Sequence, residues 1–226
     1  MKIKILHTSL KGAKKDVAVN QDSLYVCDKE DLFVSVVADG LGSASKSHIG
    51  SKLACEVIKE ITNEIVEKKN DIISLIEYKW SSKLSYFGIA NDEVCTTLSY
   101  IIIDKIKKRI FVGKIGDSPI IIRIENKTYI FNNTSKDFLN ETDGLGFKIQ
   151  EFITFDYAFN DDVCFLMATD GIGDEIEWKK INEMLDYCKT KFNHKNNISF
   201  ENEIRNAFEK LNNDDKTVII GWSYEI

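Results

Sequence analysis

Aspartates at the ends of apolar runs are the residues of this sequence best suited to chemistry. The run LFVSVVADGLG carries Asp39 where its apolar part ends, and CFLMATDGIG carries Asp170 in the same position. One Asp-Gly pair of this kind could be an ordinary turn, but two after equally apolar runs indicate a shared role. Asp22 and Asp214 stand just before runs of the same character.

These four aspartates are expected to meet at one rim of the fold. In an antiparallel sheet the start of one strand lies beside the end of its neighbour. Carboxylates gathered in this way repel one another unless protons or cations neutralise them. A set of oxygen ligands without His or Cys suits hard cations such as Mg²⁺ or Mn²⁺. The sequence therefore predicts a divalent-metal site, with the alternative that each aspartate is only a turn former or helix N-cap.

Glycines and a further aspartate extend the predicted site. Gly40 should let its own carbonyl oxygen approach an ion, and Gly42 and Gly171 are expected to adopt backbone angles that other residues avoid. Asp117 in FVGKIGDSPIII follows another apolar run. It is a fifth candidate, and a plain Asp-Ser-Pro turn is its alternative.

The composition narrows the class of protein. The chain has 226 residues, of which 43% are hydrophobic and 29% charged, and we expect one domain over residues 1–226. A net charge of −6 argues against a nucleic-acid partner, and no apolar run approaches the ~20 residues of a membrane span. The N-terminus lacks the features of a secretory signal. Five cysteines without a regular spacing indicate reduced thiols in a cytoplasmic protein.

The elements that must position the aspartates follow from periodicity. Apolar and β-branched runs bounded by turn residues predict strands over 3–8, 23–27, 32–38, 94–103, 109–115, 119–124, 127–131, 151–155, 163–169 and 216–223. Apolar spacings of three and four predict helices over 47–69 and 71–86. They predict two more helices near the C-terminus, the first marked by Trp178, Ile181, Leu185 and Cys188 and the second by Ile204, Phe208 and Leu211. Short connections favour antiparallel meanders. The expected fold class is α+β, with stacked sheets covered by helices on their outer faces.

Six motifs resemble, in order, those of the metal-dependent protein phosphatase 2C family: NQDS, VVADGLGSASKSHIGSKLA, CTTLSYIIID, GKIGDSPIII, FLMATDGIGDEI and DDKTVII. The likeness extends from Asn20 to Gly221. The DGLGSA form and the NET at 140–142 look most like a compact bacterial subgroup. The resemblance implies a four-layer αββα sandwich of two antiparallel sheets flanked by helix pairs. It also implies hydrolysis of phosphoserine and phosphothreonine in a protein substrate, the product of a Ser/Thr kinase.

The same resemblance implies site roles by position. Matching positions imply two Mn²⁺ or Mg²⁺ ions. Their ligands would be Asp22, Asp39, Asp170, Asp214 and the carbonyl oxygen of Gly40. Asp117 matches the aspartate associated with a weaker third metal. Asp214 is chosen over Asp215 because the ligand is the first aspartate of the last motif. Two divalent ions roughly 3.5–4 Å apart lower the pKa of a shared water, which can then attack phosphorus directly.

Departures from the family pattern keep alternatives open. Family members usually carry an arginine for substrate phosphate before NQD, where this chain has Val17, so Lys14 and Lys15 are the candidate phosphate-binding residues. Leu41 stands where eukaryotic relatives have a histidine. The alternatives are a pseudophosphatase that binds phosphoproteins without turnover and a hydrolase of nucleotides or other small phosphoesters. A cysteine-dependent phosphatase is excluded because no cysteine has an arginine six positions later.

Overall fold

The computed structural model describes residues 1–13, 18–68, 71–132, 143–160, 162–194 and 197–224. Their strands form two five-stranded antiparallel sheets, which we call sheet A (order β1-β10-β9-β6-β7) and sheet B (order β2-β3-β4-β5-β8). The strands of sheet A are β1 (Lys2–Leu10), β6 (Ile120–Ile124), β7 (Lys127–Phe131), β9 (Val163–Ala168) and β10 (Lys216–Tyr224). Those of sheet B are β2 (Ser23–Asp28), β3 (Leu32–Ala38), β4 (Leu98–Asp104), β5 (Arg109–Ile115) and β8 (Ile153–Ala158).

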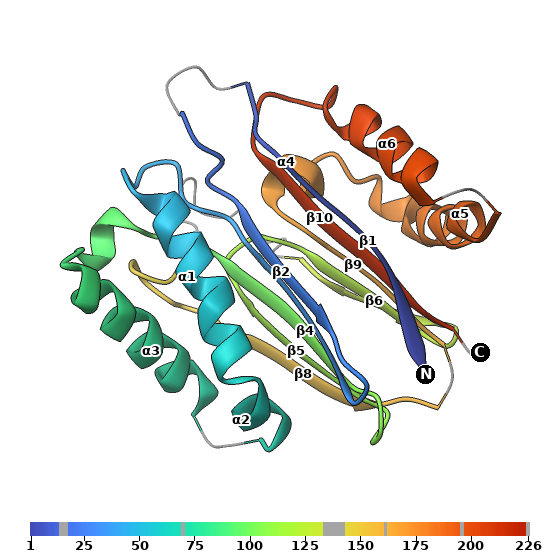
Figure 1. Ribbon diagram of the computed structural model, residues 1–226, viewed down its shortest axis with the longest axis horizontal. Helices are drawn as coiled ribbons and strands as arrows, with labels where there is room; N and C mark the ends of the chain where they lie inside the picture. Colours follow the sequence, from blue (N-terminus) through green and yellow to red (C-terminus); the bar gives the residue numbers. More distant parts are fainter. Residues whose placement is uncertain (14–17, 69–70, 133–142, 161, 195–196, 225–226) are drawn as a thin grey trace.

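Helices cover the outer face of each sheet (Figure 1). On sheet B lie α1 (Ser47–Glu60), α2 (Thr62–Val66) and α3 (Ile72–Phe87), and on sheet A lie α5 (Ile181–His194) and α6 (Asn197–Phe208). The short elements are α4 (Asp170–Gly173) and two 3₁₀ turns, η1 (Asn91–Glu93) and η2 (Trp178–Lys180). The predicted α+β class and the four-layer sandwich are confirmed. Among the described residues, no helix combines the length and the apolar character that a membrane crossing demands.

Strand periodicity divides the core into layers. Successive side chains of a strand point to opposite faces, so Phe33 and Val37 of β3 pack between the sheets while Val36 packs toward the helices. The layer between the sheets also holds Ile101 of β4 and Phe165 of β9, both fully buried. Both faces of the central strands are therefore covered, which explains why their sequences are nearly continuous apolar runs.

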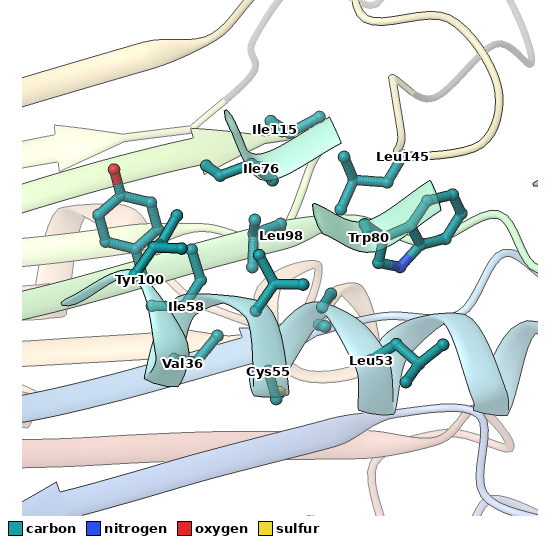
Figure 2. Packing of buried hydrophobic residues seen from close by; sticks show 14 of the residues in the cluster. Val36, Leu53, Cys55, Ile58, Ile76, Trp80, Leu98, Tyr100, Ile115 and Leu145 are labelled. Atoms are coloured by element: carbon teal, nitrogen blue, oxygen red, sulfur yellow. The ribbon is translucent and has the colours of Figure 1, made fainter. Parts of the chain in front are cut away.

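Trp80 anchors the helical layer on sheet B (Figure 2). Its indole N–H donates to the carbonyl of Gly50 in α1 at 3.1 Å, and its side chain is 1% exposed. Tyr100 of β4 and Ile58 of α1 belong to the same cluster. Truncation of Trp80 to alanine should cost about 3–5 kcal/mol of folding free energy, the usual range for a buried aromatic side chain.

Several element boundaries differ from those predicted. The helix expected over 47–69 is interrupted at Ile61, whose ψ of 16° leaves the helical range, and the Thr62 hydroxyl donates to the Ile58 carbonyl at 2.8 Å there. The strand expected from 94 begins at Leu98 instead, because Thr96 makes only isolated bridges to Gly40 and Leu145. The last predicted helix ends at residue 208, which leaves Leu211 outside it and 40% exposed.

Candidate active site

Strand register gathers four of the predicted aspartates at one rim. In sheet B, Ser23 pairs with Ala38, so Asp22 and Asp39 are neighbours just beyond the paired residues. In sheet A, Val218 pairs with Ala168, and the Thr169 N–H donates to the Thr217 carbonyl at 2.9 Å. Asp170 follows β9 and Asp214 precedes β10. Because these two strands are antiparallel neighbours, both aspartates lie at the same end of sheet A.

A pocket of about 80 Å³ lies at this rim, large enough for a few water-sized ligands. Its lining consists of Gln21, Asp39, Gly40, Leu41, Gly42, Thr97, Asp117, Asp170, Asp214 and Asp215. Asp117 reaches it from the connection between β5 and β6, where the chain crosses from sheet B to sheet A. A larger hollow of about 390 Å³ between α1 and α3 has no aspartate in its lining, so the smaller pocket is the candidate site.

Asp22 lies behind the pocket rather than on its lining. It is 7% exposed, and its Oδ2 accepts a hydrogen bond from the Thr169 hydroxyl at 2.8 Å. Its Oδ1 is buried without a hydrogen-bond partner in the described part of the chain. Burial raises the pKa of Asp22 to about 7; hydrogen bonds from Thr169 and Thr217 act against this, and the charges of Asp215 and Asp170 add to it. A buried, unpaired carboxylate oxygen is the atom that a cation would satisfy.

Asp39 and Asp170 are linked to each other. Burial is the largest cause that raises the pKa of each, and the charge of Asp117 contributes to both increases. A hydrogen bond between the two side chains raises the pKa of Asp39 and lowers that of Asp170, so Asp39 is the more readily protonated of the two. Within the described residues no three Asp, Glu, His or Cys side chains stand in a group that could hold a metal ion. The pocket thus has the oxygen donors of a hard-cation site, but Asp39 and Asp170 must give up their mutual bond to use them.

Thr97 fixes the backbone that carries Asp39. The Asp39 N–H donates to Thr97 Oγ1 at 2.9 Å, and the Thr97 N–H donates to the Asp39 carbonyl at 2.8 Å. Thr96 donates its hydroxyl to the same carbonyl at 2.9 Å. Thr97 Oγ1 also lies 2.9 Å from Ser118 Oγ, beside Asp117. The threonine pair therefore couples two aspartates from different loops, a role that the sequence interpretation did not assign.

Asp215 holds the N-terminal segment against the last loop. Its Oδ1 accepts the Gly12 N–H and its Oδ2 accepts the Gln21 N–H, both at 2.7 Å. Asp214 accepts the Asp215 N–H at 3.0 Å and also lines the pocket. Since both oxygens of Asp215 accept backbone bonds, the geometry favours Asp214 as the donor toward a ligand. The candidate phosphate-binding residues at positions 14 and 15 lie outside the described residues.

Close packing, rather than special backbone angles, explains the glycine after Asp170. A Cβ atom on Gly171 would lie 2.0 Å from the Asp215 carbonyl oxygen, which no side chain could tolerate. Among the described glycines, the positive φ angles belong to Gly88, Gly116 and Gly146. The prediction that Gly42 and Gly171 adopt angles closed to other residues was therefore wrong. Gly116, with φ of 89°, makes the turn that presents Asp117.

Comparisons with known proteins agree with this architecture. The family model described as Protein phosphatase 2C matches residues 12–211. A comparison with curated protein sequences gives no match. Among solved structures, RsbX in complex with magnesium superposes with a TM-score of 0.69 at 18% identity, covering 98% of this chain and 95% of RsbX.

Two further solved structures have the same fold. PppA, a regulatory component of the T6SS in Pseudomonas aeruginosa, has a TM-score of 0.70 at 14% identity and covers 98% of this chain and 97% of its own. The catalytic domain of the serine/threonine protein phosphatase PstP, in complex with two manganese ions, has a TM-score of 0.65 at 15% identity and 97% coverage of both chains. At such low identities the superpositions establish the fold alone. The family is shown by the family model, which covers most of the sequence. The chain belongs to the protein phosphatase 2C family.

Proposed function

We propose that this protein is a serine/threonine protein phosphatase that uses divalent cations held by the rim aspartates. The observation that carries the proposal is the convergence of Asp39, Asp117, Asp170 and Asp214 on one small pocket, in a member of this family. Two solved structures with the same fold are complexes with divalent metals: RsbX with magnesium and the PstP catalytic domain with two manganese ions. Mg²⁺ and Mn²⁺ are the hard ions that an all-oxygen site prefers.

The residues present fit such ions. Asp39, Asp170 and Asp214 offer carboxylates from three different loops, and Gly40 can add its carbonyl oxygen. Asp22 would complete the set through the buried oxygen that has no hydrogen-bond partner in the described chain. Asp117 is assigned to a weaker third position. Bound ions would supply a lowered pKa for a water nucleophile and positive charge for the phosphoryl oxygens.

The chain's own residues prepare this site. Thr97 and Thr96 hold the backbone of Asp39 through three hydrogen bonds of 2.8–2.9 Å. Thr169 orients the Asp22 carboxylate by donating its hydroxyl proton. Preorganised donors of this kind cost no reorganisation when substrate arrives. Leu41 on the pocket lining cannot exchange protons, so the leaving serine or threonine oxygen takes its proton from water rather than from that position.

The substrate is a phosphorylated protein. We assign the contact with its phosphate to Lys14 and Lys15, on the segment whose flanking residues Gly12 and Gln21 both donate to Asp215. No lysine or arginine occurs among the described residues that line the pocket, so the positive charge for a substrate phosphate must come from outside that lining. Replacement of both lysines by alanine should raise KM for a phosphopeptide more than it lowers kcat.

The five free cysteines agree with the reducing environment of the cytoplasm.

The test is hydrolysis of a phosphothreonine peptide with added Mn²⁺. Activity should disappear on addition of EDTA and in Asp39→Asn or Asp170→Asn, and it should persist in Asp162→Asn, an ion-paired surface position outside the pocket. A protein that binds phosphopeptides but never releases phosphate would be a pseudophosphatase. A large preference for nucleotides over phosphopeptides in kcat/KM would instead indicate a small-phosphoester hydrolase.

A further inference from the structure

Two lysines are buried close to the acidic pocket. Lys114 of β5 is 1% exposed and Lys216, the first residue of β10, is 2% exposed. Lysine is almost never fully buried without partners, because moving an ammonium group out of water costs several kcal/mol. Each of these lysines therefore needs an electrostatic reason for its position.

Both ammonium groups are held by the loops that carry pocket aspartates. Lys114 donates to the carbonyl of Gly116, the residue before Asp117. Lys216 donates to the carbonyls of Asn212 at 2.6 Å and Asp214 at 2.7 Å. Carbonyl oxygens orient an ammonium group, but they leave its positive charge in place.

The charge of Lys114 acts on Asp117 in particular. Strand alternation puts Lys114 on the same face of β5 as Ile110 and Val112, which pack between the sheets. Burial lowers the pKa of Lys114 to about 8, while the charges of Asp117, Glu151 and Asp143 act in the opposite direction, with Asp117 the strongest of them. The attraction of these carboxylates favours the positively charged form of Lys114.

The pocket beside these lysines is rich in carboxylates. Five aspartates line it and Asp22 lies behind them. Lys114 and Lys216 place two positively charged groups close to these six carboxylates. A cation bound at Asp117 would lie near the Lys114 ammonium group, and like charges held near each other inside a protein repel strongly.

We propose that Lys114 is a positioning residue that serves as a built-in counter-charge beside Asp117 and keeps the third cation position at Asp117 weaker than the other two. The inference rests on the proposed function of the pocket as a metal site. Three observations support it: the Lys114 ammonium group is buried, it donates a hydrogen bond to the Gly116 carbonyl, and it is attracted by the charge of Asp117. A lysine that only supported the structure would favour metal binding, so its removal would weaken binding. Lys114 instead opposes the binding of an additional ion, so its removal should strengthen binding.

The experiment measures Mn²⁺ binding to the purified protein by equilibrium dialysis, with free Mn²⁺ quantified by electron paramagnetic resonance. Lys114→Met removes both the charge and the hydrogen bond, and Lys114→Gln removes the charge but keeps a donor. Both variants should bind one more Mn²⁺ than the wild type, or bind the weakest Mn²⁺ about tenfold more tightly, since a unit charge acts strongly on a divalent ion inside a protein. Lys105→Met is the matched control, because this lysine is also buried but pairs with Asp28 at the other end of the strands.

The outcomes separate cleanly. Unchanged or weaker Mn²⁺ binding in both Lys114 variants would overturn the counter-charge role, and a change in Lys114→Met alone would assign the effect to the hydrogen bond instead. Circular dichroism verifies that each variant is folded, and Lys114→Gln keeps the test possible if the methionine variant is not. Wild-type protein that binds no Mn²⁺ would contradict the proposed function itself. Wild-type protein that binds Mn²⁺ while all variants behave alike would contradict only the role of Lys114.

Discussion

Replacement of Asp22 by asparagine should stabilise the protein in the presence of EDTA at pH 8. Asp22 is buried, and its Oδ1 has no hydrogen-bond partner in the described chain. The substitution removes a buried negative charge while keeping the size of the side chain and one oxygen for the bond from Thr169. Without metal ions the wild-type carboxylate is a net cost to folding, so its removal is expected to help.

The magnitude follows from the pKa. Burial raises the pKa of Asp22 from its ordinary value of 3.8 to about 7 in the folded chain. An acid whose pKa is higher when folded costs nothing below pH 4, where both states are protonated. It lowers stability progressively between pH 4 and about 7, and the cost is constant above that. A difference of three pKa units corresponds to about 4 kcal/mol above pH 7. Loss of the stronger bond that a carboxylate accepts from Thr169 takes back about 1–2 kcal/mol, so the net gain should be about 2–3 kcal/mol.

Urea and thermal unfolding followed by circular dichroism measure this gain at several pH values between 4 and 8 in EDTA. For a chain of this size each kcal/mol shifts the melting temperature by about 2–4 °C. The difference between Asp22→Asn and wild type should shrink toward zero near pH 4, and Asp31→Asn, at an exposed position, should follow the wild type throughout. With saturating Mn²⁺ the order should reverse. An asparagine variant that is no more stable than wild type at pH 8, or whose advantage does not depend on pH, would refute the reasoning.

Three further predictions concern the residues around the pocket. Gly171→Ala should destabilise the protein by more than 2 kcal/mol, because its Cβ would meet a carbonyl oxygen at 2.0 Å; Gly42→Ala, with its nearest atom 4.0 Å away, is the control and should be nearly neutral in urea unfolding. Asp215→Asn should cost about 1–3 kcal/mol because an amide oxygen can replace only one of two acceptors, whereas Asp214→Asn should mainly weaken Mn²⁺ binding in calorimetry. Thr169→Val should also cost about 1–3 kcal/mol, since it removes a buried hydroxyl that both donates and accepts; equal stability would contradict that role.

The layers of the fold could be predicted from the sequence because they depend on local patterns. Central strands covered on both faces require continuous apolar runs, and the amphipathic helices require spacings of three and four. The errors lie where tertiary contacts decide the boundary. Residues 94–97 have strand-like composition, but Thr96 bridges to Gly40 on one side and Leu145 on the other, so regular pairing starts only at Leu98.

The candidate site was predictable to the same extent and for a related reason. A carboxylate at the end of a buried strand is visible in the sequence, and antiparallel pairing then brings Asp22 beside Asp39. The supporting contacts were not visible because they join distant segments. Asp215 binds the Gly12 N–H across 203 positions of the chain, and Thr169 reaches Asp22 across 147. Neither distance nor partner can be inferred from the residue types alone.

Lys114 shows where a sharper sequence argument was possible. In RIFVGKI it shares strand parity with Ile110 and Val112, so alternation alone directs it toward the layer between the sheets. A lysine directed inward is unfavourable unless negative charge lies nearby, and the predicted carboxylate rim begins three residues later at Asp117. The lysine and the aspartate therefore explain each other: the acidic rim permits the buried ammonium group, and the ammonium group reduces the repulsion that the rim would otherwise have to neutralise with cations alone. An inward-facing charge next to a predicted cluster of opposite sign is thus evidence for the cluster, even before any contact is known.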